Sequence, residues 1–92
     1  MAQQVHDNPP ANRYEMPLDD GSVAVALYRR AGDRLVVYHT EVPPALNGQG
    51  LGSALVAGVL DDARARGLKV VPRCSFVAAF FRDHPEYRDL LA

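Results

Sequence analysis

Three glycines, each separated from the next by one residue, are the feature of this sequence that most directly indicates chemistry. They are Gly48, Gly50 and Gly52, and they lie between a β-branched run and an amphipathic helical pattern. Glycine lets a backbone approach a ligand closely and adopt positive φ angles. A loop that begins a helix also presents unbonded N–H groups at the positive end of the helix dipole. The segment Asn47–Ser53 is therefore predicted to bind an anion, most often phosphate.

Two common phosphate-binding motifs do not match this loop. A P-loop requires Lys and then Ser or Thr after its last glycine, whereas Ser53 and Ala54 follow Gly52. A dinucleotide fingerprint requires G-x-G-x-x-G and an acidic residue at the end of the next strand. This loop instead reads G-x-G-x-G, and Val71-Pro72-Arg73 stands at that strand end. One strand–helix–strand unit in 92 residues is also too little for a full doubly wound sheet.

The composition describes one small folded domain. The net charge of -1 argues against a dedicated nucleic-acid or membrane-surface protein, and 48% hydrophobic residues suffice for a core. A single cysteine, Cys74, excludes an internal disulfide and a cysteine-based metal cluster. We find neither an apolar run of membrane-spanning length nor a basic-then-apolar leader. We therefore expect a cytoplasmic monomer or weak dimer with no metal, nucleic-acid or membrane partner.

The first part of the chain is predicted to form an antiparallel β-meander. Residues 1–12 show no apolar period and are expected to be a flexible N-terminal tail, which leaves 13–92 as the domain. Apolar alternation and turn signals predict strands joined as a meander over 13–16, 23–28 and 35–42. The last of these is apolar on both faces in its first half, as expected of a central strand.

The second part predicts a β-α-β crossover and a second helix. The apolar spacing indicates a helix over 50–66, which Gly67 ends, and then a short strand over 68–71 parallel to the central strand. Ser75 is the expected N-cap of a second helix, which His84-Pro85 interrupts. The predicted fold class is therefore α/β, with a mixed sheet.

Several motifs resemble the GNAT N-acetyltransferase superfamily. The loop Asn47-Gly48-Gln49-Gly50-Leu51-Gly52 resembles the acetyl-CoA loop of that family, with Asn47 in place of the usual Gln or Arg. The segments His39–Pro43, Pro72–Phe76 and His84–Tyr87 resemble a short, stand-alone, single-domain subfamily. The resemblance extends roughly from residue 14 to residue 91.

The resemblance implies a compact GNAT-like fold in which the central strand splays from its parallel neighbour. Coenzyme A would lie in that split, with its pyrophosphate on backbone N–H groups of the loop. The implied cofactor-binding residues are Val42, Asn47, Gly48, Gln49, Gly50, Leu51, Gly52, Ser53 and Cys74. The implied function is transfer of an acetyl group from acetyl-CoA to a primary amine, on a small molecule or a protein lysine. Compared with full-length relatives of that family, we expect this chain to lack the early helices that build much of the amine pocket and the closing C-terminal strands.

His39 and Glu41 are candidate bases for this chemistry. Acetyl transfer requires that the amine lose a proton, that an oxyanion be stabilised and that the leaving thiolate be accommodated. The two residues lie two apart on the central strand, so their side chains point to the same face. Either can accept a proton from an amine. The alternatives are that His39 packs against the helices and that Glu41 lies at the solvent edge.

Cys74 is the third catalytic candidate, and it is paired in this hypothesis with His39. It follows the second parallel strand, at the end where open α/β sheets bind ligands, and it precedes a helix that can lower a thiol pKa. It is either a nucleophile that accepts the acetyl group, a neighbour of the coenzyme A thiol, or a small buried hydrophobe.

The acid usual in the family is missing. The resemblance places a Tyr seven residues after Cys74, but Phe81 stands there, and Phe76, Phe80 and Phe81 are all expected in the core. Two alternatives to an active acetyltransferase therefore stay open. One is a coenzyme A or acyl-CoA binding module with little turnover, and the other is an interaction domain that only keeps the fold.

Overall fold

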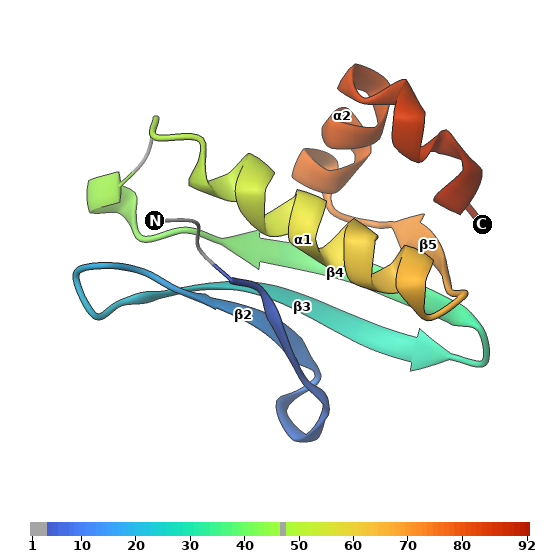
Figure 1. The fold of residues 1–92 in the computed structure, drawn as a ribbon, viewed down its shortest axis with the longest axis horizontal. Coiled ribbons are helices and arrows are strands. Elements are labelled where there is room, and N and C mark those ends of the chain that lie inside the picture. The colour runs from blue at the N-terminus through green and yellow to red at the C-terminus, as the bar shows by residue number, and fades with distance from the viewer. Residues whose placement is uncertain (1–3, 47) are drawn as a thin grey trace.

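The computed structural model describes residues 4–46 and 48–92 (Figure 1). The strands of this part of the chain are β1 (His6–Asn8), β2 (Arg13–Pro17), β3 (Val23–Ala31), β4 (Arg34–Glu41) and β5 (Lys69–Pro72). The helices are α1 (Leu51–Ala65) and α2 (Ser75–Asp83), with 3-10 turns η1 (Pro9–Ala11), η2 (Pro44–Leu46) and η3 (Pro85–Leu90).

The strands form one mixed sheet in the order β1-β2-β3-β4-β5. The pairs β1–β2, β2–β3 and β3–β4 are antiparallel, and β4–β5 is parallel. Helix α1 connects the two parallel strands, because a parallel connection needs a crossover segment. The predicted α/β fold, a meander followed by a β-α-β unit and a second helix, is confirmed.

The N-terminal segment differs from its prediction as a flexible tail over 1–12. In its described part, His6–Asn8 pairs with Arg13–Glu15 of β2. Val5 packs against the core beside α1, where a Cβ atom on Gly58 would lie 2.3 Å from a Val5 methyl group. The strand is only 3 residues long, too short to show an apolar period. The ordered domain therefore begins before residue 13.

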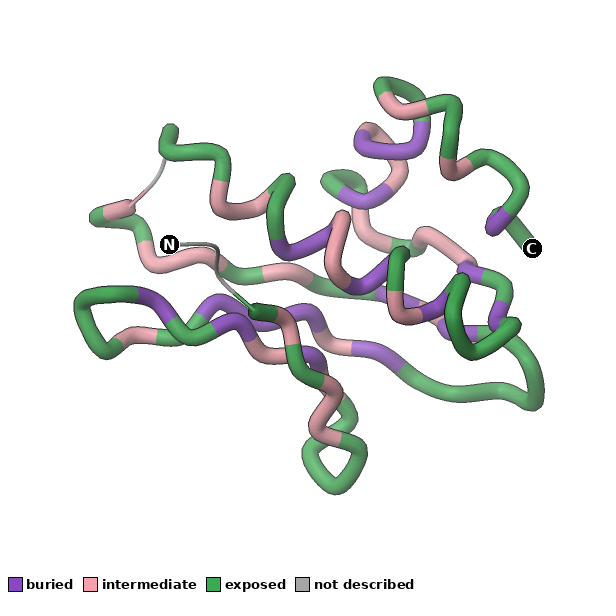
Figure 2. The backbone as a smooth tube through the Cα atoms, in the orientation of Figure 1, coloured by how far each residue is buried: buried purple, intermediate pink, exposed green. Residues whose placement is uncertain are grey.

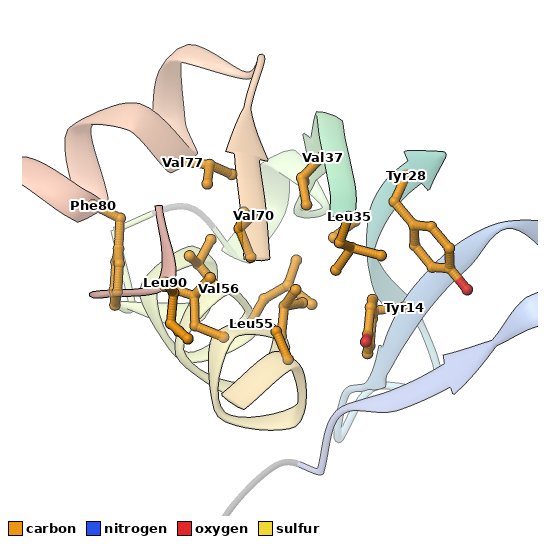
Figure 3. Close-up of a cluster of buried hydrophobic side chains, with 14 of the residues drawn as sticks. Tyr14, Tyr28, Leu35, Val37, Leu55, Val56, Val70, Val77, Phe80 and Leu90 are labelled. Carbon is orange, nitrogen blue, oxygen red and sulfur yellow. The ribbon is translucent and has the colours of Figure 1, made fainter. Parts of the chain in front are cut away.

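One hydrophobic core joins both α-helices to one face of the sheet (Figures 2 and 3). Alternate strand residues face it, as the period of two requires. They are Tyr14 and Met16 of β2, Ala24, Ala26 and Tyr28 of β3, Leu35 and Val37 of β4, and Val70 of β5. The expected core positions of Phe80 and Phe81 are confirmed, whereas Phe76 is 43% exposed and lies outside the core.

A polar network ties the first three strands to the C-terminal half of α1. The Tyr14 hydroxyl donates to Asp62 Oδ2 at 2.6 Å, and Arg66 donates to Asp62 at 2.9 Å and to Asp7 at 2.8 Å. The Tyr28 hydroxyl donates to Asp7 at 2.5 Å. Burial, together with the Asp7 carboxylate, raises the pKa of Tyr28 to about 12, so the hydroxyl stays protonated and can donate. The network fixes one end of α1.

Replacing Tyr14 with Phe is expected to lower the free energy of unfolding by about 1–2 kcal/mol, because it removes the hydroxyl that donates to the Asp62 carboxylate, which then keeps only the hydrogen bond from Arg66 among the described residues. Tyr38→Phe is the matched control, since Tyr38 is 44% exposed, and its effect should stay within about 0.5 kcal/mol. Urea titration followed by circular dichroism measures both variants. Equal free energies of unfolding for the two variants would show that the hydrogen bond from Tyr14 to Asp62 contributes nothing to stability.

Candidate functional site

The N-terminus of α1 presents backbone amides without a side-chain cap. Gly50 is the N-cap, with φ at 74°, and Gly48 also has a left-handed φ of 84°. The first helical hydrogen bond at this end runs from the Ala54 N–H to the Gly50 carbonyl at 3.1 Å. The amides of residues 51–53 precede that bond and have no partner within the helix. Together with the helix dipole they form a site suited to an anion.

A cavity of about 260 Å³ opens beside these amides. It is lined by Val42, Leu46, Gly48, Gly50, Leu51, Gly52, Ser53 and Phe76. The structure therefore brings together most of the residues that the sequence assigned to cofactor binding. Gln49 and Cys74 do not line this cavity, and Asn47 lies outside the described residues. Leu46 and Phe76 were not assigned to it.

Gly52 has a different role from the other two glycines of the loop. It lies in the first turn of α1, and a Cβ atom there would approach Phe76 Cζ to 2.8 Å. Gly52 therefore makes room for the Phe76 ring, which forms part of the cavity wall. Gly52 lies inside the first turn of the helix and has no positive φ that would require glycine. A glycine at such a position therefore indicates a close neighbour, and this was the signal in the sequence.

Strands β4 and β5 separate at Val37. The parallel register extends from Arg34 opposite Lys69 to Val37 opposite Pro72. The Val37 carbonyl then accepts the N–H of Arg73 at 2.9 Å and that of Cys74 at 3.2 Å. Beyond this point β4 continues to pair with β3 but has no partner on β5 in the described chain. The splayed strands that the resemblance implied are therefore present.

A β-bulge at Tyr38 decides which side chains face the split. Tyr28 of β3 is opposite Val37 while Leu27 is opposite His39, so Tyr38 is the extra residue. The alternation reverses there, because paired residues share a face of the sheet.

Thr40, opposite Ala26, consequently faces the helices. His39, opposite Leu27, and Glu41, opposite Val25, face the other side. Apolar alternation in the sequence does not reveal such a bulge.

Cys74 lies where β5 meets α2. It is the N-cap of α2, with φ at −93° and ψ at 133°, so the prediction that Ser75 would cap this helix is wrong by one residue. The Thr40 hydroxyl lies 3.6 Å from Cys74 Sγ. Burial would raise the pKa of the Cys74 thiol, but the backbone amides of Val77 and Phe76 and the Thr40 hydroxyl outweigh it and lower that pKa. The thiol therefore ionises more readily than an ordinary cysteine.

His39 and Glu41 do share a face, as the sequence predicted. His39 Nε2 lies 3.7 Å from Glu41 Oε2, and the two side chains are 51% and 66% exposed. Among the described residues, however, the side chain within hydrogen-bonding reach of Cys74 Sγ belongs to Thr40 and not to His39. The predicted His39–Cys74 pair is thus divided between the two faces of the sheet. Thr40 was missed because its orientation depends on the bulge.

Comparisons with known proteins agree with this geometry. The model of the family described as GCN5-related N-acetyl-transferase matches residues 13–90. Protein NATD1 of Bos taurus and that of Homo sapiens are each 35% identical to this chain over 63 residues, which is 67% of this chain and 56% of either relative. The solution structure of a GCN5-like protein from Staphylococcus aureus superposes with a TM-score of 0.74 and 25% identity, covering 99% of this chain and 89% of that one. The chain belongs to the GCN5-related N-acetyltransferase family.

The match to the curated relatives spans little more than half of their length, so their activities as whole proteins are not transferred to this chain. Within the described residues, neither α1 nor any other helix combines the length and apolarity needed to cross a membrane.

Thr40→Val is expected to raise the pKa of Cys74, because it removes the hydroxyl that helps to lower it. The pH profile of Cys74 alkylation by iodoacetamide should shift to higher pH, and alkylation at neutral pH should slow, since the thiolate is the reacting form. Thr40→Ser keeps a hydroxyl and should retain most of the original profile. An unshifted profile in Thr40→Val would remove Thr40 from the environment of the thiol.

Proposed function

We propose that this protein binds acetyl-CoA and transfers its acetyl group to a primary amine. The observation that carries the proposal is the uncapped N-terminus of α1, whose glycine loop opens onto the 260 Å³ cavity beside the split strands. Acetyl-CoA would supply the acyl group in activated form, as a thioester.

The loop fits the diphosphate of this cosubstrate. The amides of residues 51–53 point from the positive end of a 15-residue helix, and such an end stabilises an anion by about 0.3–1 kcal/mol through its dipole, in addition to hydrogen bonds. A Cβ atom at Gly48 or Gly50 would meet no atom within 4 Å from the residues that the structure describes, its chain neighbours aside, so these residues leave the approach to the amides clear. Val42 and Phe76 provide an apolar wall for the chain that follows the phosphates.

The split orients the rest of the cosubstrate. The edge of β4 beyond Val37 has no β5 partner, so its backbone is available to the amides of a pantetheine chain, much as an added strand would be bound. The thioester then lies beside Thr40 and Cys74, whose side chains are in contact. The Cys74 thiol, with its lowered pKa, gives a proton to the departing sulfur more readily than an ordinary cysteine. Phe81, only 5% exposed and without a hydroxyl, cannot serve as that donor.

His39 and Glu41 accept the proton of the amine in this scheme. They adjoin Thr40 in sequence but face the opposite side of the sheet, so an amine held there approaches from the side away from the helices.

The second candidate function is a coenzyme A or acyl-CoA binding module. It is favoured by the exposure of His39 and Glu41, because an open site excludes water from a bound amine less completely than a closed site does.

Gly50→Val is expected to abolish acetyl-CoA binding in isothermal titration calorimetry while the protein still folds. The positive φ of 74° strains a β-branched residue, and the side chain would project from the loop in front of the amides. Gly21→Val is the matched control, because Gly21 has a φ of 87° and no neighbour within 4 Å but lies in a turn away from the cavity. Unchanged affinity in Gly50→Val would exclude the loop from the site.

His39→Ala and Cys74→Ala are expected to lower transfer from labelled acetyl-CoA to an amine panel, with a loss of about 100-fold for removal of a working general base. Unchanged turnover in both variants would reject the two residues as catalytic. Binding of acetyl-CoA without turnover on any amine would favour the binding module.

A further inference from the structure

A second cavity, of about 300 Å³, lies at the end of β4. It is lined by Arg13, Val23, Val25, Glu41, Val42, Pro43 and Pro44. Val42 also lines the cavity at the glycine loop, so this one residue forms a wall of both. Glu41 and Val25 are opposite one another on β4 and β3, on the face away from the helices. The second cavity therefore adjoins the proposed acetyl-CoA site but opens from the other face of the sheet.

The floor of this cavity is apolar. Val25 is only 8% exposed, yet it does not belong to the core between sheet and helices. Val23, on the same face, is 42% exposed, and Pro43 and Pro44 add rigid apolar surface. These residues offer apolar contact to a compact hydrocarbon group, beside the polar walls at Arg13 and Glu41.

Of the two charged side chains on the cavity walls, Arg13 has a close partner of opposite charge and Glu41 does not. Arg13 Nε lies 2.6 Å from Glu15 Oε2, and Asn8 also donates to that oxygen at 3.1 Å, so the charges of Arg13 and Glu15 largely compensate each other. Glu41 has only His39, at 3.7 Å, as a charged or titratable partner among the described residues. Its carboxylate is therefore the wall group best able to receive a cation.

We propose that this cavity is the acceptor site and that it takes a primary monoamine with a compact apolar body. The inference rests on the proposed acetyl transfer and adds the class of substrate to it. The ammonium group lies at Glu41, and the hydrocarbon body lies against Val23 and Val25. Among the described residues that line the cavity, Glu41 supplies the one carboxylate, so a second ammonium group on the same molecule would lie against apolar surface and diamines are disfavoured.

The proposed step conserves atoms and charge. The acceptor ammonium first gives one proton to the Glu41–His39 pair. The amine nitrogen then bonds to the acetyl carbon as the carbon–sulfur bond breaks. The Cys74 thiol protonates the departing sulfur, and the second proton of the nitrogen restores that thiol, which leaves an amide and free coenzyme A.

Val23→Lys tests the site by placing a cation on its floor. We expect the KM for 3-methylbutylamine to rise by about tenfold or more through repulsion of the ammonium group, with little change in acetyl-CoA affinity. Leu91→Lys is the matched control, because Leu91 is 39% exposed, outside this cavity, and gains the same charge. In the unmodified protein, kcat/KM should be higher for 3-methylbutylamine than for 1,4-diaminobutane. Equal KM values in the two lysine variants, or a preference for the diamine, would overturn the proposal.

A binding measurement separates this inference from the proposed function, whether or not turnover is fast. The protein is saturated with coenzyme A and titrated with 3-methylbutylamine, while the backbone amides are followed by NMR. Shifts centred on Val23, Val25 and Glu41 support the acceptor site. Shifts centred elsewhere, or none, while coenzyme A still binds, overturn the inference and leave the proposed function standing. Absence of any acetyl-CoA or coenzyme A binding overturns both.

Discussion

The Val37 carbonyl is the point on which the arrangement of the site depends. It accepts the amides of both Arg73 and Cys74, which ends the pairing of β4 with β5 and turns the chain into α2. The same residue precedes the bulge at Tyr38, which directs Thr40 toward Cys74 and turns His39 and Glu41 to the opposite face. One hydrogen-bonding group and one extra residue thus create an open strand edge with the Cys74 thiol and the Thr40 hydroxyl on one face and the side chains of His39 and Glu41 on the other.

The hydrophobic core and the polar network hold α1 in place, and so they position the backbone amides at its N-terminus. Its C-terminal half is held by Tyr14 and Asp7 through Asp62 and Arg66, and its first turn packs on Phe76 across Gly52 (Figure 3 shows the core between these ends). An anion site made of backbone amides has no side chains to adjust, so its precision comes from the placement of the whole helix. The helix presents its dipole and its first amides at this end because its N-cap, Gly50, has no side chain to bond them.

The fold followed from the sequence where periodicity was strong. The alternation in β3, the apolar run of β4 and the amphipathic pattern of α1 each span enough residues to show their period. Strand β1 was missed because its order comes from pairing with β2 and from the contacts of Val5 and Asp7, which are long-range.

The site was predicted less completely, for a different reason. Glycine at positions 48 and 50 indicated left-handed backbone, and the structure has it. The orientation of Thr40 depends on a bulge, and the position of the Phe76 ring depends on the room left at Gly52, and neither produces a periodic signal in the sequence. The most direct test of the central claim is a crystal structure grown with acetyl-CoA. We expect diphosphate oxygens at about 2.7–3.2 Å from the amides of residues 51–53 and the thioester sulfur beside Thr40 and Cys74. A diphosphate bound elsewhere, or a protein side chain filling the cavity at the glycine loop, would contradict it.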